Sequence, residues 1–340
     1  MISYSGVKTV VTGGAGFIGS HLTEKLLTSG AEVTILDNFL HGSKVEHLRG
    51  NKNLKVYEGD VRDAETISHI LNGKDLVFHL AAIVGIEYTQ NNPFDVLDVQ
   101  IQGTTNVLKA AANNGVSRVV FASSSEVYGD SPKAMHEEGP VSPRSNYAIA
   151  NLVSEKLCRA AQQKYGLEYS CLRYFNVYGP RQDERFVISR FVNWILSRQP
   201  VQIYGDGNQT RDFNYVVDTV NMTLIAGLKP EAAYQVLNIG TGIGVSINEV
   251  ASLIAKVLGM ENTYRRTYVD YDGNRPRTTE VFTRCADTTR ANQLLQYDTR
   301  VALPLGIINY ANWYLGSEPC LDRRRLPPFP AITKKAISAT

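Results

Sequence analysis

"TGGAGFIGSHL", residues 12–22, contains three glycines at a spacing of three residues: Gly13, Gly16 and Gly19. The β-branched run "KTVV" precedes this stretch and a helical pattern over residues 18–29 follows it, so the sequence predicts a strand, a turn and a helix. Glycines at such a turn allow positive φ and close approach of a ligand to the N–H groups that begin the helix. The stretch therefore predicts a pyrophosphate site within an α/β fold.

An acidic residue follows at the distance expected for a dinucleotide-binding turn. Asp37 ends the second predicted strand, "AEVTILDN", about twenty residues after the glycines, where its carboxylate can accept hydrogen bonds from an adenosine ribose. No arginine adjoins it, and a carboxylate repels a 2′-phosphate, so the sequence favours NAD over NADP. Asp60 and Val61, in "GDVRD" after the third predicted strand, are candidates for lining the adenine.

The same alternation of short β-branched runs and helical segments continues along the chain. Further strands are predicted at "LKVYEGD", "DLVFHLAA", "SRVVFASSS" and "YSCLRYFNVYG", with helices near 64–71, 95–114 and 146–165. Strands separated by helices of this length form βαβ units, so we expect a doubly wound, mostly parallel sheet of the Rossmann type with helices on both faces.

The pattern loosens after Gly179, where Pro and Gly become frequent. We therefore expect a dinucleotide-binding domain over residues 1–179, with later segments near 210–245 returning to it. A smaller α/β substrate-binding region is expected over 180–325. The tail 326–340 combines basic residues with prolines and lacks apolar periodicity, so it is predicted to be disordered.

Composition excludes several classes of function. A formal net charge of +2 argues against a nucleic-acid-binding surface. No apolar stretch approaches the roughly 18 residues needed to span a bilayer, and residues 1–11 do not resemble a signal peptide. The four cysteines are widely spaced and include no C-x-x-C, so neither a zinc site nor a disulfide framework is expected. These features predict a cytoplasmic protein without a bound metal.

Polar side chains follow the strand "SRVVFASSS". Because ligands of open α/β sheets bind at the carboxyl ends of the strands, Ser123, Ser124, Ser125 and Glu126 in "FASSSEVYGD" are candidate site residues. About twenty residues later, Tyr147 begins "NYAIANLVSEK", and Asn151 stands four positions after it. Residues at this spacing share one face of a helix.

Taken in order, these motifs together with "RYFNVYGP", "IYGDGNQTRDF" and "LNIGTG" resemble the extended short-chain dehydrogenase/reductase family, and within it the nucleotide-sugar epimerases, dehydratases and decarboxylases. The likeness covers about residues 7–315. It implies NAD as cofactor, a nucleotide sugar as substrate, with a UDP-sugar expected, and a homodimer formed through the helices predicted at 95–114 and 146–165.

The resemblance also implies roles for individual residues. Ser124 and Tyr147 take the places of the catalytic Ser and Tyr, with Ser125, Glu126 and Asn151 beside them. The implied nucleotide-sugar contacts are Asn176, Tyr204, Arg211 and Arg277, although Arg275 competes with Arg277 for its position. The implied cofactor contacts are Gly13, Gly16, Phe17, Ile18, Gly19, Asp37, Asn38, Asp60, Val61, Leu80, Ala81, Ala82, Tyr147 and Asn151.

Asn151 departs from the family, which has Lys at this position. In the family, Tyr as phenolate removes a proton from a sugar hydroxyl, and a lysine about 4 Å away favours the phenolate by roughly 4 kcal/mol at an effective dielectric near 20, or about three pKa units. Asn supplies no charge, although its amide can still hold a ribose hydroxyl. Lys156 is predicted to lie on the opposite face of the helix, so it does not replace the missing cation.

Glu126 leaves the reaction type open. The family's dehydratases and decarboxylases commonly carry Glu here, and the dehydratases place an Asp before it as the proton donor, where this chain has Ser125. We expect oxidation of C4 to a ketone, with UDP-sugar 4-epimerisation foremost. The alternatives are dehydration or decarboxylation through Glu126, net C4 dehydrogenation, a redox-impaired binding protein, and a family member acting on another substrate.

Overall fold

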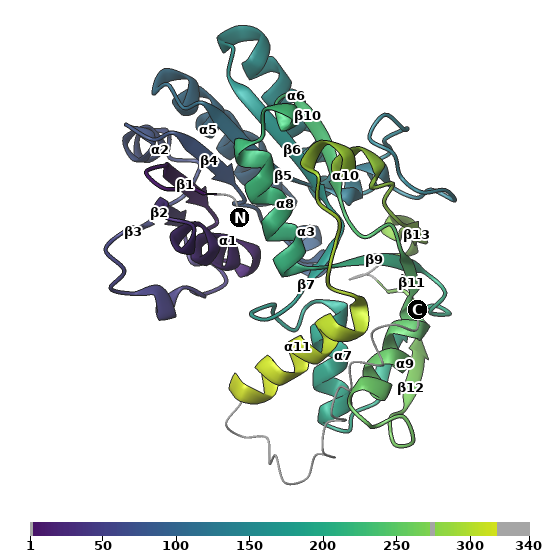
Figure 1. Ribbon diagram of the computed structural model, residues 1–340. Helices are drawn as coiled ribbons and strands as arrows, with labels where there is room; N and C mark the ends of the chain where they lie inside the picture. Colours follow the sequence, from purple (N-terminus) through teal and green to yellow (C-terminus); the bar gives the residue numbers. More distant parts are fainter. Residues whose placement is uncertain (1–2, 273–275, 318–340) are drawn as a thin grey trace.

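Seven parallel strands form the central sheet, in the order β10-β6-β5-β4-β1-β2-β3. The computed structural model describes residues 3–272 and 276–317. Strand order reverses between β1 and β4, which is the topological switch point where ligands bind in doubly wound sheets. The predicted Rossmann sheet is therefore confirmed (Figure 1).

The bounds of the strands follow the β-branched runs of the sequence. The strands are β1 Lys8–Thr12, β2 Glu32–Asp37, β3 Leu54–Glu58, β4 Leu76–His79, β5 Arg118–Ser124, β6 Glu168–Tyr174, β7 Asn176–Tyr178, β8 Val201–Tyr204, β9 Thr210–Tyr215, β10 Gln235–Ile239, β11 Gly244–Ser246, β12 Arg266–Val269 and β13 Thr283–Arg284.

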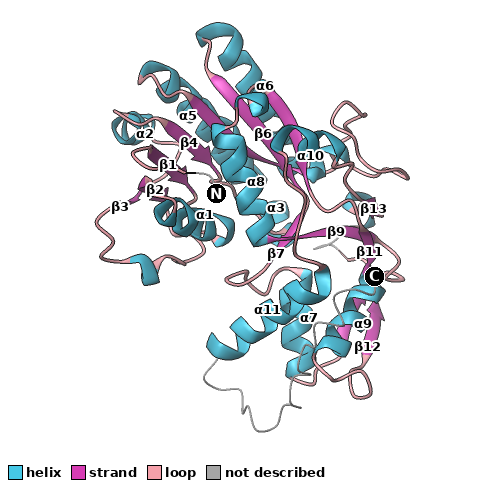
Figure 2. Cartoon of the chain, viewed as in Figure 1, coloured by secondary structure: helices cyan, strands magenta, loops and turns pink. Residues whose placement is uncertain are grey.

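Helices cover both faces of the large sheet, and further helices form much of the smaller second region (Figure 2). The α-helices are α1 Phe17–Thr28, α2 Ala64–Leu71, α3 Ile86–Asn91, α4 Pro93–Leu97, α5 Gly103–Asn113, α6 Asn146–Tyr165, α7 Val187–Leu196, α8 Val216–Leu228, α9 Ile247–Val257, α10 Thr289–Leu295 and α11 Leu303–Ser317. The shorter helices used below are η2 Asp98–Gln102, η3 Ser125–Tyr128 and η5 Arg277–Thr279.

Three apolar clusters account for most of the buried core. One cluster packs α1 and α8 against the sheet and includes Leu22, Val216 and Ile239. A second packs α2, α5 and α6 against the opposite face and includes Ile67 and Val107. The third lies away from the large sheet, where α7, α9 and α11 pack together around residues such as Val192, Ile254 and Ile307.

The chain passes more than once between the seven-stranded sheet and the smaller second region. Strand β9 lies at the centre of a small sheet, where it pairs with β7, β11 and β13. The next strand, β10, is the edge strand of the seven-stranded sheet beside β6. Segments within 210–245 thus contribute to both sheets.

Two predicted elements differ from the structure. The strand expected at 169–179 is divided. The N–H of Phe175 still donates to the carbonyl oxygen of Ile239 in β10, and from Asn176 onward the chain leaves the large sheet and pairs with β9 as β7. The helix expected at 95–114 is interrupted by the π-helical turn η2 between α4 and α5. The predicted disordered tail, residues 326–340, lies outside the described residues.

Candidate active site

The glycine turn has the geometry of an anion-binding site. Gly13 has φ of +69°, and an added Cβ there would lie 2.8 Å from the Ala81 nitrogen. At Gly19 an added Cβ would lie 2.1 Å from the Gly13 carbonyl oxygen, so the turn and helix α1 approach too closely for any side chain. Gly16 precedes α1, and an added Cβ meets only the Gly13 oxygen, at 3.3 Å. That open side leaves room for a pyrophosphate at the beginning of the helix, beside Phe17 and Ile18.

Asp37 connects the end of β2 to this turn. Its carboxylate accepts hydrogen bonds from the N–H of Ala15 at 3.0 Å and of Phe39 at 2.9 Å. Burial raises the pKa of Asp37, and these two hydrogen bonds oppose the rise. A carboxylate has about four acceptor positions, so Asp37 keeps capacity for ribose hydroxyls.

Asp60 and Val61, the residues expected near the adenine, differ from each other in their surroundings. Hydrogen bonding by Arg62 lowers the pKa of Asp60, and the Asn38 side chain contributes in the same direction. Val61 is buried against Gly103, where an added Cβ would lie 2.5 Å from a Val61 methyl carbon. The adenine contact therefore remains a prediction for Asp60 and Val61, and the cofactor contact of Asn38 likewise stays a prediction.

The segment after β4 lies directly beside the glycine turn. The Leu80 N–H donates to the Thr12 carbonyl oxygen at 3.0 Å, and the Ala81 N–H donates to the Thr12 hydroxyl at 3.3 Å. Residues Leu80, Ala81 and Ala82 thus border the switch point between β1 and β4, as a cofactor-binding segment would.

Tyr147 and Ser124 are brought together by β5 and α6. Ser124 ends β5, and its hydroxyl accepts the Glu126 N–H at 3.2 Å, which begins the short helix η3 containing Ser125. Burial and the charge of Glu126 raise the pKa of Tyr147 to about 12, while hydrogen bonding with Ser124 and Asn151 acts in the opposite direction. The predicted Ser and Tyr therefore lie in contact at the carboxyl edge of the sheet.

Ser145 holds Glu126 beside this pair. Its hydroxyl caps α6 by accepting the Ala148 N–H at 3.1 Å, and it donates to a Glu126 carboxylate oxygen at 3.2 Å. One side chain thus fixes both the beginning of the helix that carries Tyr147 and the position of Glu126.

Asn151 is fully buried, with both parts of its amide engaged. Its Nδ2 donates to the Tyr147 carbonyl oxygen at 2.9 Å, and its Oδ1 accepts from Nε2 of Gln100 at 3.1 Å. Lys156 is exposed, in agreement with the opposite helix face predicted for it.

The four predicted substrate residues lie in the second region or lead into it. The Asn176 side-chain oxygen is buried without a hydrogen-bond partner among the described residues, which suits a residue that meets a ligand. Tyr204 ends β8 and lies 6.1 Å from the Tyr271 ring. Arg211 is buried and ion-paired with Glu280, whereas Arg277, in η5, is exposed. Arg275 lies outside the described residues.

Arg284 is a site residue that the sequence did not single out. Its guanidinium lies 3.5 Å from the Glu126 carboxylate, and only 9% of its side chain is exposed. It pairs in register with Arg211 across β13 and β9, and its charge lowers the pKa of Tyr147. The only sequence signal was an arginine next to the "ADTTRA" motif, because the contact with Glu126 spans 158 residues.

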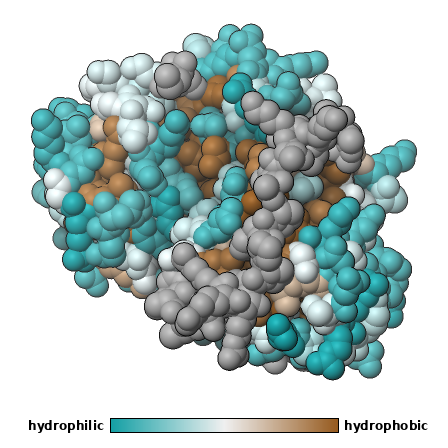
Figure 3. Space-filling view, turned by 60° about the horizontal axis from the view of Figure 1, so that its bottom comes forward, coloured by the Kyte–Doolittle hydropathy of each residue, from teal (hydrophilic) through white to brown (hydrophobic). Residues whose placement is uncertain are grey.

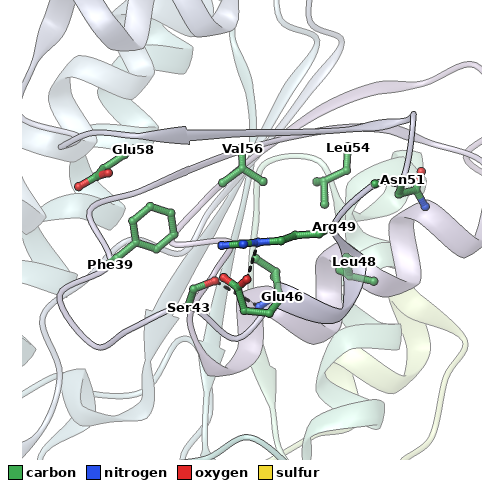
Figure 4. Close-up of a pocket in the computed structure, with 11 residues that line it drawn as sticks. Phe39, Ser43, Glu46, Leu48, Arg49, Asn51, Leu54, Val56 and Glu58 are labelled. Atoms are coloured by element: carbon green, nitrogen blue, oxygen red, sulfur yellow. Dashed lines mark hydrogen bonds and ion pairs between the residues drawn. The ribbon is translucent and has the colours of Figure 1, made fainter.

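A cavity elsewhere holds none of these catalytic or substrate residues. It measures about 500 Å³ and lies between β3 and the loop 39–51 (Figure 4). Its lining includes Phe39 and Val56, and the ion pair of Glu46 with Arg49 forms part of the wall on the side of the loop. Figure 3 shows one face of the whole molecule. Most of the apolar residues visible on it lie toward the middle, and hydrophilic residues occupy most of the outer parts.

Residues 3–272 and 276–317 contain neither a membrane-spanning helix nor a metal-binding cluster. None of the helices there has the length and apolar character needed to cross a membrane. The same residues contain no cluster of three or more His, Cys, Asp or Glu side chains that could hold a metal ion.

Comparison with known proteins gives consistent matches. Residues 9–240 match the model of the NAD-dependent epimerase/dehydratase family. A UDP-N-acetyl-alpha-D-glucosaminuronate decarboxylase of Bacillus cytotoxicus is 35% identical over 90% of this chain and 97% of that protein. A putative UDP-glucose 4-epimerase of Methanocaldococcus jannaschii is 37% identical over 89% and 97% of the two chains. A Bacillus cereus UDP-glucuronic acid 4-epimerase mutant, solved with UDP-4-deoxy-4-fluoro-glucuronic acid and NAD, superimposes with a TM-score of 0.84, 30% identity, and coverage of 91% and 99%.

Proposed function

This chain belongs to the NAD-dependent epimerase/dehydratase family, and we propose that it oxidises C4 of a UDP-sugar, with 4-epimerisation as its main reaction. NAD is the cofactor, and the glycine turn with Asp37 is the cradle that suits it. The observation that carries the proposal is the contact of Tyr147 with Ser124, at the carboxyl edge of the sheet and beside the switch point.

In this proposal the chain's own residues bind the sugar and move its proton. Tyr147 as phenolate removes the proton of the C4 hydroxyl, and the Ser124 hydroxyl completes the hydrogen bonds to the same oxygen. Bound NAD supplies a reversible hydride acceptor, so that C4 can pass through the ketone and regain hydrogen on either face. Tyr147 is partly buried, so a bound sugar and the cofactor would be needed to complete the exclusion of water from the reacting oxygen.

The ionisation of Tyr147 limits this chemistry at neutral pH. Because burial raises the pKa of Tyr147 to about 12, only a very small fraction of this residue is ionised at pH 7. The positive charge of Arg284 favours the phenolate of Tyr147. The negative charge of Glu126, which is ion-paired with Arg284, opposes this effect. Turnover is therefore expected to be slow at pH 7 and to rise toward alkaline pH.

A second candidate reaction, decarboxylation or dehydration, is favoured by the pair of Glu126 and Arg284. Oxidation of C4 makes the hydrogen on C5 more acidic, and in a dehydration the Glu126 carboxylate can remove that proton. In a decarboxylation, Arg284 can bind the carboxyl group of a uronate sugar, which then faces Glu126. The Bacillus cytotoxicus relative is a UDP-N-acetyl-alpha-D-glucosaminuronate decarboxylase. Ser125 is a poor proton donor, so standard 4,6-dehydration is the weaker form of this alternative.

Glu126→Gln separates the two reactions. In an epimerase, removing a negative charge near Tyr147 favours the phenolate, so turnover near pH 7 should be retained or rise several-fold. In an elimination or decarboxylation through Glu126, turnover should fall by about 10²–10⁴-fold. NMR of the sugar formed from UDP-glucose, UDP-N-acetylglucosamine and UDP-glucuronate distinguishes the outcomes. Glu138→Gln, which changes an exposed carboxylate in the segment after η3, is the control.

Arg277→Ala should weaken UDP binding about ten- to a hundred-fold and leave NAD binding unchanged. The reason is that a hydrogen bond to a charged group contributes roughly 1.5–3 kcal/mol, and we propose that Arg277 grips the diphosphate. Arg277 is a cleaner test than Arg211, because the loss of Arg211 would also remove its buried ion pair with Glu280. Isothermal titration with UDP and with NAD measures both affinities.

The control for this test is Arg266→Ala, which removes an exposed arginine from β12 in the same region. Equal weakening of UDP and NAD by Arg277→Ala would point to a disturbed fold. Weakening by Arg266→Ala as large as that by Arg277→Ala would mean a general charge effect rather than a diphosphate contact.

A homodimer in the cytoplasm is also proposed. Phe94 on α4 and Ile149 on α6 expose 79% and 43% of their surface, which suits helices that pack against a second copy. Cys158, Cys171 and Cys285 are free thiols, which suits a reducing compartment. Sedimentation at micromolar concentration, compared with a Phe94→Asp variant, decides the oligomeric state.

A further inference from the structure

Residues 180–185 form a strap between the second region and the cofactor side of the large sheet. The strap follows β7 and precedes α7. Within it, Arg181 has a φ of +70°, a left-handed conformation that is uncommon for a residue other than glycine. Such backbone strain persists where surrounding contacts hold it in place, and it is concentrated at functional sites. The contacts of Arg181 therefore bear on what the strap does.

Arg181 binds three side chains on the cofactor side. Its Nη2 donates to the Glu24 carboxylate at 2.6 Å and to Nδ1 of His21 at 2.9 Å, both on helix α1. Its Nη1 lies 3.4 Å from Nε2 of His47, in the loop 39–51. Only 17% of the Arg181 side chain is exposed. Arg181 thus attaches the strap to the helix that begins at the glycine turn and to the loop beside that turn.

His21 adds a backbone contact to the same attachment. Its Nε2–H donates to the Pro180 carbonyl oxygen at 2.8 Å, and its Nδ1 is the acceptor for Arg181. Burial lowers the pKa of His21 to about 4, so the ring is neutral near pH 7 and one tautomer makes both contacts. Arg181, His21 and Glu24 together form a latch that consists only of protein groups.

The other end of the strap is attached to the segment after β4. Nη1 of Arg185 donates to the Val84 carbonyl oxygen at 3.2 Å, just beyond Ala82. The Asp183 carboxylate accepts hydrogen bonds from Nε of Arg185 at 2.8 Å and from its Nη2 at 2.7 Å. This bidentate pair fixes the guanidinium that makes the contact with Val84.

The two attachments lie on opposite sides of the cofactor crevice. The loop 39–51 borders the glycine turn, because the Lys44 N–H donates to the Ala15 carbonyl oxygen at 3.0 Å. The segment after β4 borders the same turn across the switch point, through the contact of Ala81 with Thr12. Ligands of doubly wound sheets bind in this crevice. The strap therefore joins both sides of the crevice that NAD has to enter.

We propose that the latch of Arg181, His21 and Glu24 keeps the strap closed over the cofactor crevice and sets how fast NAD is exchanged. Because the latch consists only of protein groups, it opposes entry and departure of NAD alike. Its loss should therefore raise the association and dissociation rates together and leave the affinity almost unchanged. A residue that binds NAD directly would change mainly the dissociation rate. The proposal depends on NAD as the cofactor and is independent of the proposed sugar chemistry.

Arg181→Gln tests the latch, because glutamine removes the charge and most of the donors of the guanidinium. Both rates should rise about five- to thirty-fold, the factor for losing a partly exposed charged hydrogen bond, and the dissociation constant should change by less than about threefold. Stopped-flow fluorescence of NADH mixed with the full chain measures association. Displacement of bound NADH by excess NAD measures dissociation.

Arg198→Gln is the matched control. It removes the same charge from an exposed position just after α7, so both rates should stay unchanged. Glu24→Ala removes the other half of the ion pair and should also raise both rates. In the Glu24→Ala background, Arg181→Gln should have a smaller effect than in the unmodified chain, because the two side chains share one contact. If Arg181→Gln does not fold, Glu24→Ala must raise both rates by itself.

Three results would overturn the proposal: unchanged rates in Arg181→Gln, an equal rise in Arg198→Gln, or a faster dissociation alone with a matching loss of affinity. The last result would assign Arg181 to direct binding of the cofactor or to the stability of the fold. A failure of the proposed function would look different. In that case both rates would still respond to the latch, while no UDP-sugar would be turned over.

Discussion

Tyr147→Phe is expected to reduce turnover by about 10²–10⁴-fold, the range that a positioned general base contributes, while NAD stays bound. Phenylalanine keeps the ring and its packing in α6 and removes only the phenol oxygen that contacts Ser124. The measurement is product formation by NMR, together with the amount of NAD released from the denatured protein.

Tyr165→Phe is the control for this change. Tyr165 ends the same helix, and 43% of its surface is exposed, so loss of its hydroxyl should alter neither turnover nor NAD content. If Tyr147→Phe kept full activity, Tyr147 would not be the base, and the carboxylate of Glu126 would take its place in the mechanism.

Asn151→Lys is expected to move the rising limb of the pH profile to lower pH by one to about three units. An ammonium about 4 Å from the phenol contributes roughly 4 kcal/mol at an effective dielectric near 20, and it favours the charged phenolate. Because burial raises the pKa of Tyr147 to about 12, lowering that pKa increases the ionised fraction near pH 7, and turnover there should rise. The profile of kcat/KM between pH 6 and 10 measures the shift.

Asn151→Met separates charge from shape in this experiment. Methionine has nearly the length of lysine, so both variants meet the same packing around the fully buried position, but only lysine adds charge. If Asn151→Lys shifts the rising limb of the pH profile and Asn151→Met does not, the shift is caused by the added charge. An unchanged profile in Asn151→Lys, with NAD still bound, would show that Asn151 has a role that a cation cannot fill.

Local patterns were enough to predict the frame of the site. The glycine turn, Asp37 at the end of β2 and Tyr147 in the first turn of α6 all lie where the sequence placed them. Each depends on contacts within a few residues: turn chemistry, strand periodicity and the Ser145 cap of α6. The helix pattern over 95–114 did not reveal the π-turn, because a single widened turn is too short to be recognised in the apolar spacing.

The sequence by itself determined the parallel sheet, the cofactor cradle and the presence of Asn at position 151, four residues after Tyr147. Only the tertiary structure decided what surrounds Tyr147. Gln100 reaches Asn151 because η2 packs on α6, and Arg284 reaches Glu126 because β13 pairs with β9. These contacts join residues 51 and 158 positions apart, and they depend on strand order and register. Those quantities are set by the packing of the whole chain, since no local pattern encodes which distant strand or helix becomes a neighbour.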